Sequence, residues 1–251
     1  MLTIHPLTAI GEVLPGDDLA ALLAAALRSA GLELQRFDIL VVTQKIVSKA
    51  EGRFVDLAGV VPGAEAMRLA GTTRKDPRLV ELVLAESSDV VRAVPHVLIT
   101  RHRSGHVMAN AGIDQSNIGS SGAELALLLP EDADASAQRL REALERVWPA
   151  GFGVLVSDSF GRPWRYGVTN VAIGGSGFPA LIDRRGTPDR DGRILEVTQV
   201  ALGDMAASAA GLVTGEGAEG VPAALIRGLS WDTAPNPAAA LVRPLGEDLF
   251  R

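Results

Sequence analysis

Four side chains with hard oxygen donors stand out in this sequence, because each lies in a short segment rich in small or polar residues. Carboxylate and hydroxyl oxygens are the ligands that Mg²⁺ and Mn²⁺ prefer, and such ions bridge protein carboxylates to substrate phosphates. Taken singly, each aspartate has the alternative role of capping a turn or a helix. Taken together, they predict a divalent-cation site for phosphate chemistry. The four side chains are Asp114, Asp158, Ser159 and Glu216.

The run Gln44–Arg53 is dense in hydrogen-bond donors. This run holds Lys45 and Lys49, and Lys75 is the only other lysine of the chain. A lysine beside the end of a strand can act as a point charge on a phosphate. The alternative interpretation is an exposed amphipathic strand whose lysines are solvated.

Other catalytic patterns are missing from the sequence. The glycine-rich run 173–177 lacks the Gly-Lys-Ser/Thr ending of a nucleotide-binding P-loop, so we interpret it as a close approach of backbones. Ser159 does not lie in a Gly-x-Ser-x-Gly elbow, which argues against a serine hydrolase. The four histidines show no metal-ligand spacing, and the absence of cysteine excludes disulfides and thiolate metal sites.

The composition sets further limits. The chain has 251 residues with 24 Lys+Arg against 30 Asp+Glu, a formal charge of −6, and this balance argues against a nucleic-acid partner. Hydrophobic residues make up 47%, enough for a sizeable core. The longest wholly apolar run, Leu19–Leu27, is too short to cross a bilayer. The first basic residue is Arg28, so the N-terminal residues lack the positive charge that begins a secretory signal. These features predict a cytoplasmic protein without a membrane partner.

The elements that must position the polar residues alternate between helical and strand patterns, which predicts a mixed α and β architecture. Open α/β sheets bind ligands beyond the carboxyl ends of their strands. We expect strands over 39–43 and 153–157, which lead directly into Lys45 and Asp158. Helices are expected over 19–30 and 204–212, and two more are expected to begin at 77 and at 134. Further strands are expected over 194–198 and 221–227. Residues 97–100 and 106–109 are expected to form a hairpin.

Four segments, in order and with similar spacing, resemble the coenzyme F420:L-glutamate ligase family, also called F420-0:γ-glutamyl ligase. The likeness extends to about Gly228, and the second and fourth segments are its most specific parts. The segments are Leu14–Leu19, Val41–Arg53, Ala111–Asn117 and Ser157–Arg165.

The resemblance implies an α+β protein with mixed sheets, an unusual two-domain fold and a homodimeric assembly. It divides the chain into a catalytic unit over 1–230, built of two intertwined subdomains, and a C-terminal tail over 231–251. The implied reaction adds one or more L-glutamates, through γ-linkages, to the lactyl phosphodiester of the deazaflavin coenzyme F420-0 or its unsaturated relative. GTP is the cosubstrate with Mg²⁺ or Mn²⁺, and the resemblance leaves open whether K⁺ assists.

The same resemblance implies roles for individual residues. Asp114, Asp158 and Lys49 are expected to be catalytic, and Asp114, Asp158, Ser159 and Glu216 to hold the metal. The assignment of Glu216 is the least direct, since some relatives carry glutamine or lysine there. The expected nucleotide-binding residues are Ile10, Gly11, Glu12, Val13, Gln44, Lys49, Asn117, Thr214, Gly215, Glu216, Gly217, Ala218, Glu219, Gly220 and Val221.

Arg162 and Arg165 are expected to bind the anionic acceptor through paired hydrogen bonds from their guanidinium groups. The alternative is that they form surface ion pairs.

A carboxylate is a poor electrophile, so phosphoryl transfer from GTP to form an acyl phosphate is the expected activation. Two other functions stay open for this sequence. One is a metal-dependent phosphohydrolase or nucleotidyl transferase, and the other is a non-catalytic GTP-binding module.

Overall fold

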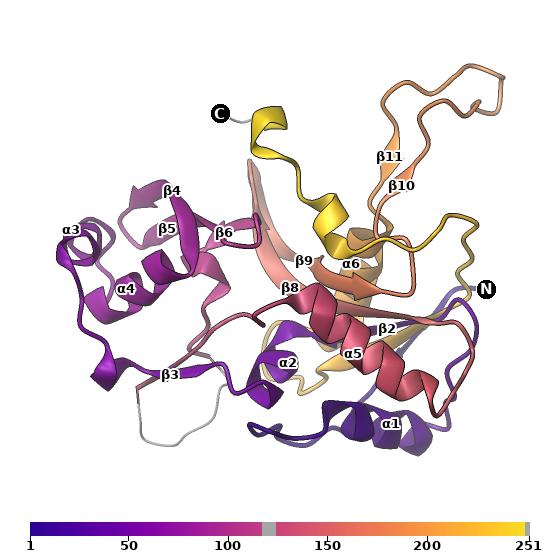
Figure 1. The fold of residues 1–251 in the computed structure, drawn as a ribbon, viewed down its shortest axis with the longest axis horizontal. Helices are drawn as coiled ribbons and strands as arrows, with labels where there is room; N and C mark the ends of the chain where they lie inside the picture. The colour runs from indigo at the N-terminus through magenta and orange to yellow at the C-terminus, as the bar shows by residue number, and fades with distance from the viewer. Residues whose placement is uncertain (117–123, 249–251) are drawn as a thin grey trace.

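A five-stranded mixed sheet forms the centre of the protein in the computed structural model, which describes residues 1–116 and 124–248 (Figure 1). The strand order is β1-β12-β2-β8-β9. The pair β2 and β8 is parallel, with Thr43 opposite Ser157, and the other pairs are antiparallel. The carboxyl end of β2 therefore lies beside residue 157 of β8. The bounds are β1 (Thr3–Pro6), β2 (Ile39–Thr43), β8 (Gly153–Arg162), β9 (Arg165–Ser176) and β12 (Ala223–Arg227).

Helices cover both faces of this sheet. Alternate residues of a strand point to opposite faces, and β2 follows this rule. Leu40 and Val42 are buried with residues of α1 and α5, whereas Ile39 and Val41 are buried with residues of α6. The helices are α1 (Leu19–Ser29), α5 (Ala133–Glu145) and α6 (Leu202–Thr214).

A second group of elements lies beside the sheet and has its own buried cluster, which includes Leu69, Val80 and Leu98 (Figure 1). The strands of this group form a two-stranded pair, β3-β7, and a three-stranded sheet, β4-β5-β6. Its elements are β3 (Phe54–Asp56), η1 (Leu57–Gly59), α3 (Ala64–Thr73), α4 (Pro77–Ala85), β4 (Ser87–Val94), β5 (Val97–His102), β6 (Val107–Ala109), η2 (Asn110–Gly112) and β7 (Leu125–Leu127). The fold is thus a mixed α+β structure, as the sequence pattern predicts.

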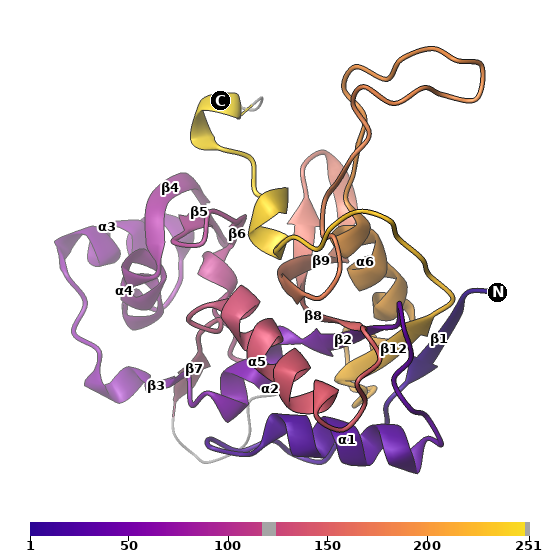
Figure 2. The same ribbon diagram turned by 45° about the vertical axis from the view of Figure 1, so that its right-hand side comes forward.

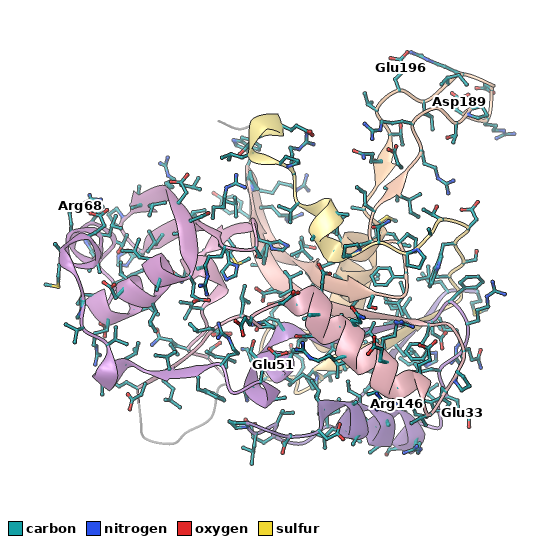
Figure 3. The ribbon with its side chains drawn as sticks, viewed as in Figure 1. Glu33, Glu51, Arg68, Arg146, Asp189 and Glu196 are labelled. Atoms are coloured by element: carbon teal, nitrogen blue, oxygen red, sulfur yellow. The ribbon has the colours of Figure 1, made fainter. Side chains whose placement is uncertain are left out.

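A long hairpin projects from the body between β10 (Ile182–Asp183) and β11 (Gln199–Val200) (Figure 2). Figure 3 shows the charged side chains of Asp189 and Glu196 far out on it. The strand expected over 194–198 is wrong, because this stretch lies in the projecting hairpin and only Ile194 makes an isolated bridge. Its β-branched residues favour a strand locally, but among the described residues only the other arm of the hairpin pairs with this stretch, through contacts that include the Pro188–Ile194 bridge and a hydrogen bond from Arg184 N–H to the carbonyl of Thr198.

The segment after residue 231 packs back onto the body. Ala238 is fully buried in the cluster beneath α6. The carboxylate of Asp134 accepts hydrogen bonds from the backbone of Gly175 at 2.7 Å and of Ala238 at 2.8 Å, which ties this segment to β9 and α5. It contains the short 3₁₀ turns η3 (Ala238–Leu241) and η4 (Leu245–Glu247).

Local signals predict most elements correctly. Asp18 caps α1, and Asp76 caps α4 through the amide of Arg78 at 2.8 Å. The close backbone approach expected in 173–177 is also confirmed: a Cβ on Gly174 would lie 2.2 Å from the carbonyl oxygen of Ala133 in α5. In the described ranges, no helix has the length and apolar character needed to cross a membrane.

Two local expectations near the site are wrong. The alternative of an exposed strand after residue 44 fails, because the segment forms α2 (Gln44–Ala50) and buries Lys49. The strand expected to stop at residue 157 runs on to Arg162, because β9 pairs with its polar continuation. The polar side chains therefore sit on a paired strand and are more firmly positioned than a loop would hold them.

Candidate active site

A polar cavity of about 630 Å³ opens at the carboxyl end of β2 and beside residues 157–159 of β8. Its volume lies in the range of small-molecule sites. Segments far apart in the chain meet in it, as the strand-end argument predicts. The lining comprises residues 10–13, 43–46, 49, 114, 116, 157–159, 170, 214–218 and 220–222.

The turn from β2 into α2 brings two lysines to the cavity. Thr43 ends the strand and precedes the first helical turn, so Lys45 and Lys49 lie one turn apart on the same helix face. Lys49 is buried, and its Nζ lies 2.5 Å from Oε1 of the exposed Glu12. Lys45 contacts a different carboxylate of the lining, and its Nζ lies 2.7 Å from Oδ2 of Asp114.

Asp114 is fixed by its backbone and by both carboxylate oxygens. Its N–H and C=O pair with Leu127 at 3.0 and 2.8 Å, and its Oδ1 accepts bonds from the N–H and Oγ of Ser116, both at 2.7 Å. Burial alone would raise the pKa of Asp114, but hydrogen bonds from Lys45 and Ser116 lower it below its ordinary value. This carboxylate is therefore ionised at neutral pH.

Asp158 differs from Asp114, because its surroundings favour the neutral carboxylic acid. Burial raises its pKa to about 7, and the negative charges of Asp114 and Glu216 act in the same direction, against the opposing bond from the backbone of Ser159. A cation placed among these groups would stabilise the ionised form. Asp158 is therefore the carboxylate whose charge depends most on what occupies the cavity.

These residues fit a divalent cation by the chemistry of the donor set. The carboxylates that raise the pKa of Asp158 supply the hard oxygens and the negative charge that attract such an ion. In the described residues, no three Asp, Glu or His side chains form a ready-made metal-binding group. Mg²⁺ commonly takes only one or two carboxylates, and substrate phosphates and water complete its coordination.

A glycine-rich loop closes the cavity after α6. The helix ends at Thr214 and is capped by Gly215, whose φ of 69° is a conformation that glycine adopts without strain. Glu216 lines the cavity, whereas Glu219 does not, because its carboxylate folds back onto the N–H of Gly217 at 2.7 Å. Exposed backbone amides in such loops are suited to bind phosphate oxygens.

The structure gathers nearly all the predicted site residues in this one cavity. Of the predicted nucleotide-binding residues, Glu219 lies outside the lining, and Asn117 lies outside the described residues. Asp114, Asp158, Ser159 and Glu216 all line it, whereas Arg162 and Arg165 lie on the tip of the β8–β9 hairpin.

Sequence reasoning misses several lining residues, among them Thr43, Ser116, Ser157 and Asn170. Asn170 lies opposite Ser159 on β9. That pairing depends on the β8–β9 register, and no local pattern indicates it. Lys45 is predicted from the sequence only as a point charge for phosphate beside a strand end, and its contact with Asp114 has no local signal.

The fold and cavity define a mixed α+β protein with a charged ligand cavity beside two parallel strands. The F420-0:γ-glutamyl ligase family model matches residues 8–228, and the chain belongs to this family. The resemblance seen in the sequence is thereby confirmed.

Three relatives that match along most of their length are each named coenzyme F420:L-glutamate ligase. The chain is 44% identical to the protein of Methanopyrus kandleri, over 100% of this chain and 98% of the relative. It is 42% identical to the protein of Methanothermobacter thermautotrophicus, over 94% of this chain and 93% of the relative. It is 46% identical to the protein of Natronomonas pharaonis, over 94% of this chain and 89% of the relative.

Proposed function

We propose that this chain is a GTP- and divalent-metal-dependent ligase that adds L-glutamate to coenzyme F420-0 in coenzyme F420 biosynthesis, through an acyl-phosphate intermediate. Family membership and relatives of nearly equal length support the substrate pair. The observation that carries the proposal is the cavity, which combines two lysines with carboxylates on separate elements. That combination suits a polyphosphate bound together with a divalent cation.

The reaction proceeds in two displacements. A carboxylate oxygen of the acceptor attacks the γ-phosphorus of GTP, the bond to the β-phosphate oxygen breaks, and GDP leaves. The amine of glutamate then attacks the acyl carbon, the bond to the phosphate oxygen breaks, and inorganic phosphate leaves. The nitrogen gives up its proton to solvent or to a basic group of the site.

The chain's own residues bind and orient these groups. Lys49 is held by Glu12 at the wall formed by 10–13, where its ammonium can contact phosphate oxygens. Residues 215–218 and 220–222 of the glycine-rich loop line the same cavity. Asp114, Asp158 and Ser159, with Glu216, would hold one or two Mg²⁺ or Mn²⁺ ions, which supply neutralisation of the phosphate charge and polarisation of the phosphorus.

The tip of the β8–β9 hairpin is the proposed contact for the rest of the acceptor. Arg162 donates to the carbonyl of Tyr166 at 2.9 Å and so holds the turn. Arg165 is exposed there, and Trp164 and Tyr166 are 82% and 102% exposed. At about 3.3 Å per residue, the tip lies roughly 10 Å or more beyond Ser159. An acceptor with its carboxylate in the cavity could place its phosphodiester or planar ring there.

Replacing Arg165 by alanine is expected to raise the KM for the acceptor about tenfold and to leave the KM values for GTP and glutamate unchanged, because a charge-assisted bond to an anion is lost. Steady-state kinetics with each substrate varied in turn measures the effect. Arg190→Ala, on the projecting hairpin, removes the same charge from a remote surface and should change none of the three values. An unchanged acceptor KM in Arg165→Ala contradicts the assignment.

The homodimer implied by the family resemblance is part of this proposal. Light scattering at several concentrations measures the assembly state.

The proposed reaction is tested by incubating the protein with F420-0, GTP, Mn²⁺ and L-glutamate and analysing the product by mass spectrometry. The expected product is the acceptor extended by one or more glutamyl residues, with one GTP consumed per addition. Phosphate release without glutamate would identify a phosphohydrolase instead. GTP binding without turnover would identify a nucleotide-binding module.

A further inference from the structure

Lys45 is placed where a metal ion would be expected. Its Nζ lies 2.7 Å from Oδ2 of Asp114 and 3.0 Å from the carbonyl oxygen of Ser116, with Oγ of Ser116 at 3.5 Å. A cation surrounded by a carboxylate, a carbonyl and a hydroxyl oxygen has the environment that hard metal ions also take. The side chains of Lys45 and Asp114 both line the cavity.

The Lys45 ammonium and a divalent ion cannot share Asp114 freely. Oδ1 of Asp114 already accepts two bonds from Ser116, so Oδ2 is the oxygen left to face the cavity, and Lys45 contacts it. An ion bound at Oδ2 would also meet the like charge of the ammonium a few ångströms away. The Asp114 and Lys45 side chains are 28% and 25% exposed, so the pair is reachable from solvent.

The second lysine of α2 has a different arrangement. Lys49 is only 5% exposed in its side chain, and its partner Glu12 belongs to the wall formed by 10–13. Its ammonium therefore does not compete for the proposed metal-binding oxygens. The contrast points to a distinct task for Lys45.

We propose that the Lys45 ammonium occupies the cation position at Asp114 in the free protein, and that Lys45 must leave Asp114 before a divalent cation binds there. The inference rests on the proposed function in one respect, the use of Asp114 as a metal ligand. Lys45 is on this account a positioning residue. It holds the Asp114 carboxylate in place without a metal, and after displacement its ammonium stays in the cavity, where phosphate oxygens can accept from it.

The test is the binding of Mn²⁺ alone to the full chain, measured by the electron paramagnetic resonance signal of free Mn²⁺. Lys45→Met should bind Mn²⁺ roughly tenfold more tightly than the unaltered protein, because a competing cation is removed next to the site. Lys45→Arg retains the charge and should bind with nearly unaltered affinity. Lys75→Met removes a lysine that does not line the cavity and is the matched control.

A double-mutant comparison identifies the site of competition. Asp114→Asn should weaken Mn²⁺ binding, and adding Lys45→Met to it should change the affinity little, because the contested oxygen has lost its charge. A purely structural ion pair would lower the melting temperature of Lys45→Met without tightening Mn²⁺ binding. The inference is overturned if Lys45→Met has a lower melting temperature without tighter Mn²⁺ binding. It is also overturned if Lys45→Met binds Mn²⁺ more weakly than the unaltered protein or not measurably.

The ligation assay separates this inference from the proposed function. If the unaltered protein ligates glutamate and Lys45→Met does not gain Mn²⁺ affinity, only the role of Lys45 is wrong. If Lys45→Met gains affinity but the unaltered protein ligates nothing, the cation exchange stands and the proposed reaction is wrong.

Discussion

Asp158→Asn is expected to lower the rate of glutamate ligation about 10³-fold at neutral pH, with the fold retained. The amide keeps the shape of the carboxylate but lacks the charge that would hold a cation against the phosphates, and such electrostatic contributions to phosphoryl transfer are large. Asp114→Asn should have a loss of similar size. Initial rates with F420-0, GTP, Mn²⁺ and glutamate measure the effect, and far-ultraviolet circular dichroism checks the fold.

The same substitution should make the metal-free protein more stable at high pH. The folded state raises the pKa of Asp158 to about 7. The stability associated with this raised pKa is fully present below the unfolded value of about 4 and is lost as the pH rises through about 7. In EDTA at pH 8, Asp158→Asn should therefore increase the free energy of unfolding by about 4 kcal/mol, since a shift from about 4 to about 7 is roughly three pKa units of about 1.4 kcal/mol each. At pH 4 the two proteins should differ little.

Asp191→Asn on the projecting hairpin is the matched control, and both its ligation rate and its stability should stay near those of the unaltered protein. Near-normal ligation by both Asp114→Asn and Asp158→Asn would show that the metal and catalytic assignments are wrong. A lower stability of Asp158→Asn in EDTA at pH 8 would contradict the electrostatic account of its burial.

The second large effect is expected from Gly174→Ala, which should destabilise the fold by about 3 kcal/mol or more. The added Cβ would lie 2.2 Å from the carbonyl oxygen and 2.3 Å from the carbonyl carbon of Ala133. Backbone atoms at the start of α5 cannot rotate away as a flexible side chain can, so the helix must move off β9. Thermal unfolding should show a midpoint lowered by roughly 10 °C.

Gly71→Ala is the control for this prediction. Gly71 lies inside α3 at an ordinary helical conformation, and an added Cβ there meets nothing within 4 Å. Alanine should raise stability by about 0.5–1 kcal/mol, since it is the better helix former. Equal midpoints for Gly174→Ala and the unaltered protein would show that α5 and β9 are not packed as described.

Part of the site could be predicted because local sequence and sheet geometry agree. The apolar runs 39–43 and 153–157 predict two buried strands, and each leads directly into charged residues. Once the strands pair in parallel, with Thr43 beside Ser157, the polar side chains that follow must lie near one another. The convergence of Lys45 and Asp158 follows from this rule.

The rest depends on pairing between distant segments. The polar stretch 158–162 has no apolar alternation, so only its partner β9 identifies it as a strand. The β-branched residues Ile46 and Val47 favour a strand, yet the segment forms α2 and both side chains are buried in the main core. The stretch 194–198 has strand propensity, but in the described part of the chain its only bridge is the isolated one of Ile194 with Pro188. In each case tertiary context decides against the local pattern.

Ligation through an acyl phosphate is tested most directly by following oxygen-18 from a labelled acceptor carboxylate during the reaction in unlabelled water. A GTP-dependent ligase acting through an acyl phosphate must transfer one labelled oxygen to inorganic phosphate for each amide bond formed, with GDP as the other product. Phosphate without the label, or phosphate formed equally well without glutamate, would contradict the proposed reaction.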